Sequence, residues 1–170
     1  LHYPLRRQRQ MCIRDSDYEW IDLTQYQLNP VRDYRHEDKS IDSYADDYKT
    51  LIDKVLASDT VIIASPVYWY SLSASMKAFF DHWSETLLDS NYKDFKDKMS
   101  KKDFRLIIVG GDCPKVKAKP CITQVKYSLE FLGASLGGYI IGTAERPGDI
   151  EKDVYALSRA KECQQTLGKN

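Results

Sequence analysis

Two loops of this 170-residue chain carry side chains suited to holding a flat, phosphorylated cofactor. The first loop runs from Ser65 to Ser73 and reads SPVYWYSLS, so that three aromatic side chains are available to cover a ring system. Its serines stand at the start of an expected helix, where unpaired backbone N–H groups favour anionic or carbonyl oxygens. The second loop runs from Gly110 to Pro114 and opens with paired glycines, which let a backbone approach a flat ligand closely.

The elements that position these loops alternate between strand and helix. Short, apolar, β-branched runs such as TVIIA are typical of strands that are buried on both faces. The expected strands span residues 17–23, 60–64, 104–109 and 136–141, and the expected helices span residues 44–56, 72–87, 120–132 and 149–167, with Asp42 and Asp149 as N-caps. This order predicts an α/β fold with a parallel sheet and helices on both faces. Open parallel sheets bind ligands beyond the C-terminal ends of their strands, which is where both loops lie.

A charged stretch and one helix face are given structural interpretations. The run from Lys93 to Arg105 is interpreted as a solvated connection. Phe79, Phe80 and Trp83 lie at helical spacing and are expected in the core. His82 beside them is a candidate proton donor, but a lone histidine in such a place is usually structural.

The segment around the first loop resembles a known family. SDTVIIASPVYW (58–69), continued by Ser71, Ala74, MKAF (76–79) and Asp81, is similar to the flavodoxin-like NAD(P)H-dependent FMN reductases. That family shows an acidic residue before a buried strand, a Pro-x-Tyr-Trp loop and a helix with a Lys-x-Phe-x-Asp pattern. The paired glycines after the next strand agree with the resemblance.

The resemblance implies a three-layer flavodoxin-like fold with strand order 2-1-3-4-5. It also implies non-covalent FMN, reduction by NADPH or NADH, and transfer of electrons to a small-molecule acceptor such as a quinone, a flavin, or an azo or nitro compound, or to a protein. Members are commonly homodimers. No catalytic side chain is expected, because hydride transfer to a flavin needs no protein nucleophile. No metal is expected, because Cys113 and Cys121 stand alone. The residues that the resemblance assigns to cofactor binding are Pro66, Val67, Tyr68, Trp69, Tyr70, Ser71, Gly110, Gly111 and Asp112.

One part of the family pattern is not found in the sequence. The family holds the FMN phosphate in a Ser/Thr-rich loop after its first strand, and residues 18–23 correspond to its second strand. Only sixteen residues precede Asp17, whereas a strand, loop and helix need about 30. We therefore expect residues 17–170 to be a truncated flavodoxin-like domain without the first strand and the phosphate loop.

The first sixteen residues differ from the rest in charge. Residues 1–16 carry a net charge of +3 and residues 17–170 a net charge of −3. The string PLRRQRQMCIRDS resembles translated sequencing-adapter read-through, so we interpret residues 1–16 as non-native. The other interpretations are a basic arm for nucleic acid or anionic lipid, a targeting peptide, or a disordered terminus.

Composition excludes several functional classes. A formal net charge of zero argues against binding nucleic acid through a general basic field. The longest apolar runs, Val61 to Ala64 among them, are too short to span a membrane, and no apolar signal region is present. The four widely spread cysteines are typical of free thiols in a reducing compartment, so we expect a cytoplasmic protein.

Two alternatives to a reductase stay open at this point. The first is a flavodoxin-type electron carrier without NAD(P)H activity. It is disfavoured because such carriers are usually strongly acidic, while residues 17–170 are only mildly so. The second is a non-catalytic fragment that has lost FMN binding.

Overall fold

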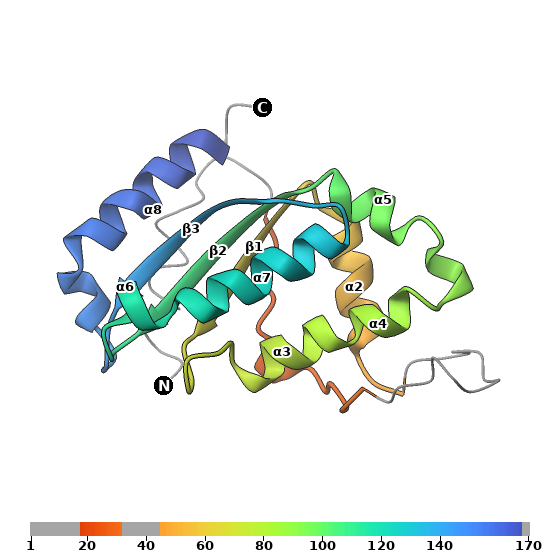
Figure 1. The fold of residues 1–170 in the computed structure, drawn as a ribbon, viewed down its shortest axis with the longest axis horizontal. Helices are drawn as coiled ribbons and strands as arrows, with labels where there is room; N and C mark the ends of the chain where they lie inside the picture. Colours follow the sequence, from red (N-terminus) through yellow and green to blue (C-terminus); the bar gives the residue numbers. More distant parts are fainter. Residues whose placement is uncertain (1–17, 32–44, 168–170) are drawn as a thin grey trace.

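The centre of the molecule is a parallel sheet of three strands in the order β1-β2-β3 (Figure 1). The computed structural model describes residues 18–31 and 45–167. The strands are β1 (Thr60–Pro66), β2 (Asp103–Gly110) and β3 (Leu136–Thr143). Ile63 of β1 is in register with Leu106 of β2, and Ile108 of β2 with Ile141 of β3. The predicted α/β fold with parallel strands is confirmed.

Helices precede, connect and follow these strands along the chain. The α-helices are α2 (Tyr48–Ala57), α3 (Ala74–Asp81), α4 (Trp83–Thr86), α5 (Phe95–Ser100), α6 (Pro114–Lys117), α7 (Lys119–Phe131) and α8 (Val154–Leu167), and the 3-10 helices are η1 (Leu23–Gln25), η2 (Ser90–Tyr92) and η3 (Asp149–Lys152). Among the residues described, no helix has both the length and the apolar character that a membrane crossing requires.

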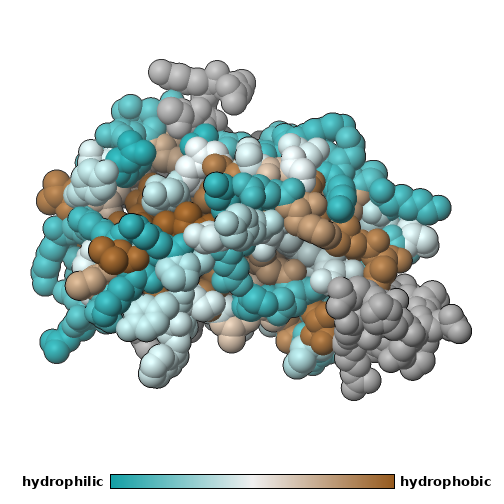
Figure 2. All heavy atoms as spheres, viewed as in Figure 1, coloured by the Kyte–Doolittle hydropathy of each residue, from teal (hydrophilic) through white to brown (hydrophobic). Residues whose placement is uncertain are grey.

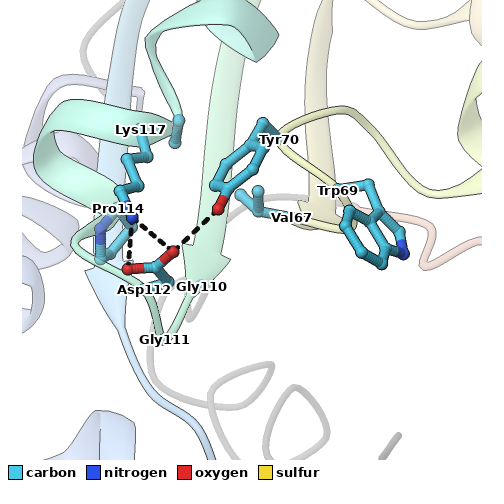
Figure 3. Close-up of a pocket in the computed structure, with 9 residues that line it drawn as sticks. Val67, Trp69, Tyr70, Gly110, Gly111, Asp112, Pro114 and Lys117 are labelled. Atoms are coloured by element: carbon cyan, nitrogen blue, oxygen red, sulfur yellow. Dashed lines mark hydrogen bonds and ion pairs between the residues drawn. The ribbon is translucent and has the colours of Figure 1, made fainter.

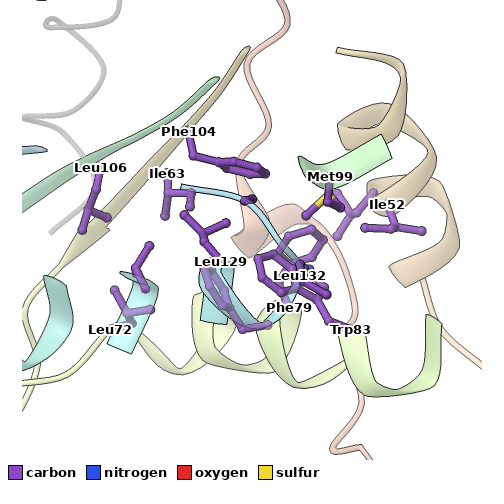
Figure 4. Packing of buried hydrophobic residues seen from close by; sticks show 14 of the residues in the cluster. Ile52, Ile63, Leu72, Phe79, Trp83, Met99, Phe104, Leu106, Leu129 and Leu132 are labelled. Atoms are coloured by element: carbon purple, nitrogen blue, oxygen red, sulfur yellow. The ribbon is translucent and has the colours of Figure 1, made fainter. Parts of the chain in front are cut away.

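One face of the sheet packs against the main hydrophobic core. Phe104, Leu106 and Ile108 alternate along β2 and are fully buried against side chains from α2, α3, α4, α5 and α7. Figure 4 shows Phe79 and Trp83 packed together below this face, and both are buried as the sequence predicts. On the outside, polar and charged side chains separate the apolar patches that are visible in Figure 2. The core therefore lies on the face of the sheet that α7 covers.

The opposite face of the sheet is covered unevenly. Beside β3, a Cβ built on Gly142 would lie 2.5 Å from Cδ1 of Ile150, so η3 approaches the sheet closely there. Beside β1, Ile62 on the same face is 37% exposed. The prediction that β1 is buried on both faces is therefore wrong for this strand. The physical reason is that none of the described elements packs over Ile62.

The predicted strand over residues 17–23 is also wrong for its described part. Residues 18–22 form no regular element, and η1 begins at Leu23. Tyr18 and Trp20 are 50% and 41% exposed. A strand is stabilised by pairing with a neighbour, and the only described partner of β1 is β2. Residues 18–22 pair with neither open edge of the described sheet, β1 or β3.

The charged run from Lys93 to Arg105 contains a helix that the sequence interpretation missed. Helix α5 buries Phe95 and Met99, which are 1% and 0% exposed. These two residues are four apart and so lie on one face of a helix. Charged residues surround them in sequence because they occupy the solvent face of the same helix. The stretch is therefore part of the core as well as a connection.

Three helix boundaries differ from those predicted. Helix α2 begins at Tyr48 after the N-cap Asp47, and the predicted cap Asp42 lies outside the described residues. The predicted helix over residues 72–87 is divided at His82 into α3 and α4. Asp149 starts η3 rather than capping α8. At the start of α8, it is the carboxylate of Asp153 that accepts a hydrogen bond from a backbone N–H, that of Ala156 at 3.0 Å.

Candidate functional site

The loops that follow β1 and β2 meet at the C-terminal edge of the sheet. The backbone N–H of Val67 donates to the Val109 carbonyl at 2.8 Å and joins the bases of the two loops. Between the loops lies an open pocket of about 170 Å³ (Figure 3). It is lined by Val67, Trp69, Tyr70, Gly110, Gly111, Asp112, Pro114, Lys117 and Ala118.

The structure brings six of the nine predicted cofactor residues to this pocket. They are Val67, Trp69, Tyr70, Gly110, Gly111 and Asp112. The other three, Pro66, Tyr68 and Ser71, belong to the same first loop but do not line the pocket. Lys117 and Pro114 line it without having been predicted as cofactor residues. Pro114 ends the second loop that the sequence singles out, whereas Lys117 lies beyond it and no sequence motif points to it.

The first loop is a tight two-residue turn with unusual backbone angles. Tyr68 and Ser71 each donate a backbone N–H to the other's carbonyl at 3.0 Å. Between them, Trp69 and Tyr70 have φ angles of 49° and 62°, in the left-handed region. Turns of this kind favour glycine or asparagine, and a left-handed residue of another type costs about 1–3 kcal/mol. Trp69 is 95% exposed, so its burial does not offset this strain.

Hydroxyl groups of the first loop hold the loop itself. Ser65 Oγ accepts a hydrogen bond from the Ser73 N–H at 3.0 Å and donates to the Pro66 carbonyl at 2.9 Å. Ser73 in turn is the N-cap of α3 and accepts from the Met76 N–H at 3.4 Å. Both hydroxyls therefore serve to fix the path of the chain from β1 into α3.

The second loop passes close to its neighbours. A Cβ on Gly110 would lie 3.2 Å from Cβ of Val67, and a Cβ on Gly111 would lie 2.4 Å from Cγ of Glu145. These glycines allow the second loop to pack against the first loop and against the chain after β3. Cys113 follows with a φ of 45°, so all three left-handed residues other than glycine in the described chain lie in these two loops. Backbone strain of this kind clusters at functional sites.

Charged groups of the pocket form a connected set. The Asp112 carboxylate accepts a hydrogen bond from the Tyr70 hydroxyl at 2.9 Å and from Lys117 Nζ at 2.6 Å. Lys117, followed by Tyr70, lowers the pKa of Asp112 below its usual value. Asp112 in turn raises the pKa of Lys117. The pocket therefore holds Asp112 as a carboxylate whose charge is offset by Lys117.

Other candidate residues lie apart from the pocket. His82 is 3% exposed and is held by the Glu85 carboxylate at 2.5 Å and by the Asn29 carbonyl at 3.0 Å. Lys77 and Asp81 form the ion pair that their spacing predicts. Cys121 is buried, and burial raises the pKa of its thiol, whereas Cys113 is exposed; both are free cysteines.

A parallel α/β sheet with a pocket beyond the C-terminal ends of adjacent strands is typical of the open α/β folds that bind nucleotide cofactors, the flavodoxin-like class among them. The chain belongs to the NADPH-dependent FMN reductase family, whose model matches residues 5–111. The matched range includes both the turn at Tyr68–Ser71 and the paired glycines.

Individual relatives agree with this family. A Bacillus subtilis protein named as an NAD(P)H-dependent FMN-containing oxidoreductase is 41% identical over 149 residues, which cover 88% of this chain and 82% of that protein. An FMN-dependent NADH:quinone oxidoreductase of Cellvibrio japonicus is 24% identical over 128 residues, covering 72% and 63%.

Solved structures support the fold. The Trp repressor binding protein of Bacillus subtilis matches with a TM-score of 0.66 and 44% identity over 68% of this chain and 70% of its own. The azoreductase AzrA matches with a TM-score of 0.60 at 16% identity over 86% and 80%, which is a likeness of fold alone.

Proposed function

We propose that this chain binds FMN with the ring end of the cofactor at the pocket between the two loops. In the proposed reaction NADPH or NADH reduces the flavin, and the electrons then pass to a small-molecule acceptor. The observation that carries the proposal is the convergence of six predicted cofactor residues, from segments about forty positions apart, on one pocket. Family membership supports the same activity.

The residues present fit one end of this cofactor. Cofactor sites are mostly apolar and aromatic, with a few polar groups, which describes Val67, Trp69 and Tyr70 beside Asp112 and Lys117. The pocket has a volume of about 170 Å³, whereas a complete small-molecule site usually has a volume of roughly 300–1,000 Å³. It therefore suits the ring end of FMN, with the phosphate end outside it.

Bound FMN supplies a ring that accepts hydride from a nicotinamide and gives electrons to an acceptor. In our proposal Trp69, which lines the pocket and is 95% exposed, covers the ring and excludes water from it. The second loop, from Gly110 to Asp112, meets the other side of the ring. Lys117 balances the charge of Asp112, so that the pocket does not repel the phosphates of a nicotinamide nucleotide.

We further propose the class of acceptor, the assembly and the location. A relative is named as an FMN-dependent NADH:quinone oxidoreductase, which favours a quinone as acceptor. We propose a homodimer in the cytoplasm. Sedimentation of the purified chain tests the dimer, because a monomer at micromolar concentration contradicts it.

Titration of the chain with FMN, followed by anaerobic addition of NADPH or NADH, tests the function. We expect quenching of flavin fluorescence on binding and then loss of the visible flavin absorbance. Binding without loss of absorbance on addition of either nucleotide indicates the electron-carrier alternative. Absence of binding indicates a fragment that has lost its cofactor, and either result contradicts the proposal.

We also propose that residues 17–170 form the body of a truncated domain, with residues 1–16 not contributing to it. The exposed face of Ile62 and the open edge of β1 in the described sheet support a place for a further strand and helix. The family match starts at residue 5 and so extends into residues 1–16; this part of the match does not support the proposal. Deletion of residues 1–16 tests the proposal: we expect unchanged melting temperature and FMN affinity, and a loss of either contradicts it.

A further inference from the structure

We propose that Tyr70, Asp112 and Lys117 form a latch that locks the two loops of the pocket together and keeps them in the arrangement that receives FMN. The inference rests on the proposed function for the identity of the ligand. In it, Tyr70 and Asp112 are positioning residues that act on the cofactor through the geometry of the loops. Lys117, which no sequence motif singles out, is the third member.

The latch crosses from one loop to the other. Tyr70 belongs to the turn after β1, Asp112 to the loop after β2, and Lys117 to the end of α6. Oδ2 of Asp112 accepts two hydrogen bonds, from the Tyr70 hydroxyl at 2.9 Å and from Lys117 Nζ at 2.6 Å. Figure 3 shows the three side chains pointing toward one another across the pocket.

Lys117 strengthens the latch in two ways. Its ammonium group contacts both carboxylate oxygens of Asp112, at 2.6 and 2.8 Å, and so holds the carboxylate in place for Tyr70. It also lies 5.6 Å from the centre of the Tyr70 ring, within the range of a cation–π contact. A hydrogen bond to a charged acceptor is stronger than one between neutral groups. Each member therefore depends on the other two.

The latch opposes backbone strain at the turn. Tyr70 has a left-handed φ of 62°, a conformation that needs support from its surroundings. Its other ties to the rest of the site are weaker: the Cys121 thiol donates to its carbonyl at 3.3 Å, and the neighbouring Ser71 hydroxyl lies 3.4 Å from Gln124 Oε1. The hydrogen bond to Asp112 is thus the strongest side-chain tie from this turn to the second loop.

The latch also determines where the indole of Trp69 is presented. Trp69 precedes Tyr70 in the turn, and Figure 3 shows its ring directed away from the latch while the Tyr70 ring faces it. Fixing Tyr70 therefore fixes the backbone from which the indole of Trp69 projects, because this side chain is 95% exposed and adds little packing of its own. Pre-organisation of this kind improves affinity, because the loops lose less conformational freedom when a ligand binds.

Hydrogen-exchange mass spectrometry of the protein without FMN tests the latch across the pocket. In Y70F we expect backbone amides of residues 110–118 to exchange about two- to fivefold faster. In K117M we expect the same increase in the exchange rate of residues 66–72. An increase of this size corresponds to the contribution of an exposed charged pair. The double variant Y70F/K117M should show no more than the larger single effect, and K117R should restore slow exchange. Acceleration confined to the mutated loop overturns the proposal.

FMN affinity provides the second arm of the test. We expect Y70F and K117M to weaken FMN binding by about two- to fivefold at unchanged melting temperature. The matched controls are Y127F and K126M on α7, where Tyr127 is 64% exposed and Lys126 lies 3.7 Å from Glu130. These controls should change neither exchange in the loops nor affinity.

The two arms separate failure of the latch from failure of the proposed function. If the unaltered chain binds no FMN, the function is contradicted, and the exchange experiment still decides whether the loops are coupled. If the unaltered chain binds FMN and the latch variants bind it equally well, the latch has no role in the site and the inference is overturned.

Discussion

The ring of Tyr48 stacks on the imidazole of His82, with the ring centroids 4.6 Å apart and the planes inclined by 17°. Tyr48 begins α2, and His82 stands at the junction of α3 and α4. The two carboxylates of Asp46 and Glu85 contact the same imidazole, at 3.2 and 2.5 Å, and all three side chains are largely buried. His82 therefore joins the chain before α2 to α3 and α4.

Replacement of His82 by alanine is expected to lower the free energy of unfolding by about 2–4 kcal/mol, because two largely buried carboxylates lose a partner. Urea denaturation measures the change. The control is K77A on α3, whose exposed ion pair with Asp81 should contribute less than about 1 kcal/mol. A loss in H82A no greater than that in K77A contradicts a structural role for the histidine.

The strained turn predicts a variant that gains stability at the expense of binding. W69N removes an exposed indole from a left-handed position that asparagine tolerates, so the free energy of unfolding should stay equal or rise by about 1 kcal/mol. FMN affinity should fall, because the ring loses an aromatic cover. Thermal melting and flavin titration measure the two effects.

The control for this variant is Y127N, at an exposed tyrosine in the middle of α7. Asparagine is a poorer helix former than most residues and should leave stability slightly lower there, without an effect on FMN. A W69N protein that is clearly less stable than the unaltered chain shows that the turn is not strained.

The short helix α5 predicts a large effect within a charged stretch. Met99 is fully buried in the core, so M99A should lower the free energy of unfolding by about 2–5 kcal/mol. K101A, two residues further on, alters a side chain that is 70% exposed and should stay within about 0.5 kcal/mol. Chemical denaturation of both proteins measures the two changes. If the stretch were only the solvated connection that the sequence suggested, M99A and K101A would lower the free energy of unfolding equally.

Stability should depend on pH through Asp153 at the start of α8. Burial raises the pKa of this carboxyl group, but the N–H groups of Ala156 and Thr143 lower it more, so that the pKa lies below its usual value of 3.8. Stability from the ionised group is therefore present above that value and is lost as the pH falls through the lower pKa of the folded protein.

D153A should accordingly lower the free energy of unfolding by about 1 kcal/mol at pH 7, as for other helix caps. The difference from the unaltered chain should shrink as the pH falls below about 4. Urea denaturation of D153A and of the unaltered chain, at pH 7 and at a pH below about 4, measures this difference. E162A, at an exposed ion pair with Arg159 in the same helix, is the control and should have a small effect at pH 7. A D153A deficit that is equal at both pH values would falsify the assignment.

Local sequence patterns were sufficient for the three strands and for the place of the site. The run from Val61 to Ala64 and the strand from Phe104 to Val109 carry the residue types of parallel strands, and the structure confirms that both are parallel strands, within β1 and β2. Because the C-terminal ends of parallel strands meet at one edge, the loops after them were expected to lie together. The pocket shows that they do.

Patterns failed where an element depends on a neighbour. Residues 18–22 alternate as a strand does but pair with neither open edge of the described sheet, and Phe95 and Met99 are two apolar residues among many charged ones. Whether such segments become strand, helix or loop depends on the surface that they meet. That surface is made by residues far away in the sequence.

The sequence by itself determined the parallel α/β fold and the two loops, because each follows from the residue types of a short segment. Only the tertiary structure decided that Lys117 reaches Asp112 and that Asp112 accepts the Tyr70 hydroxyl. Hydrogen bonds need donor and acceptor within about 3 Å, and that distance is set by how β1, β2 and α6 pack together.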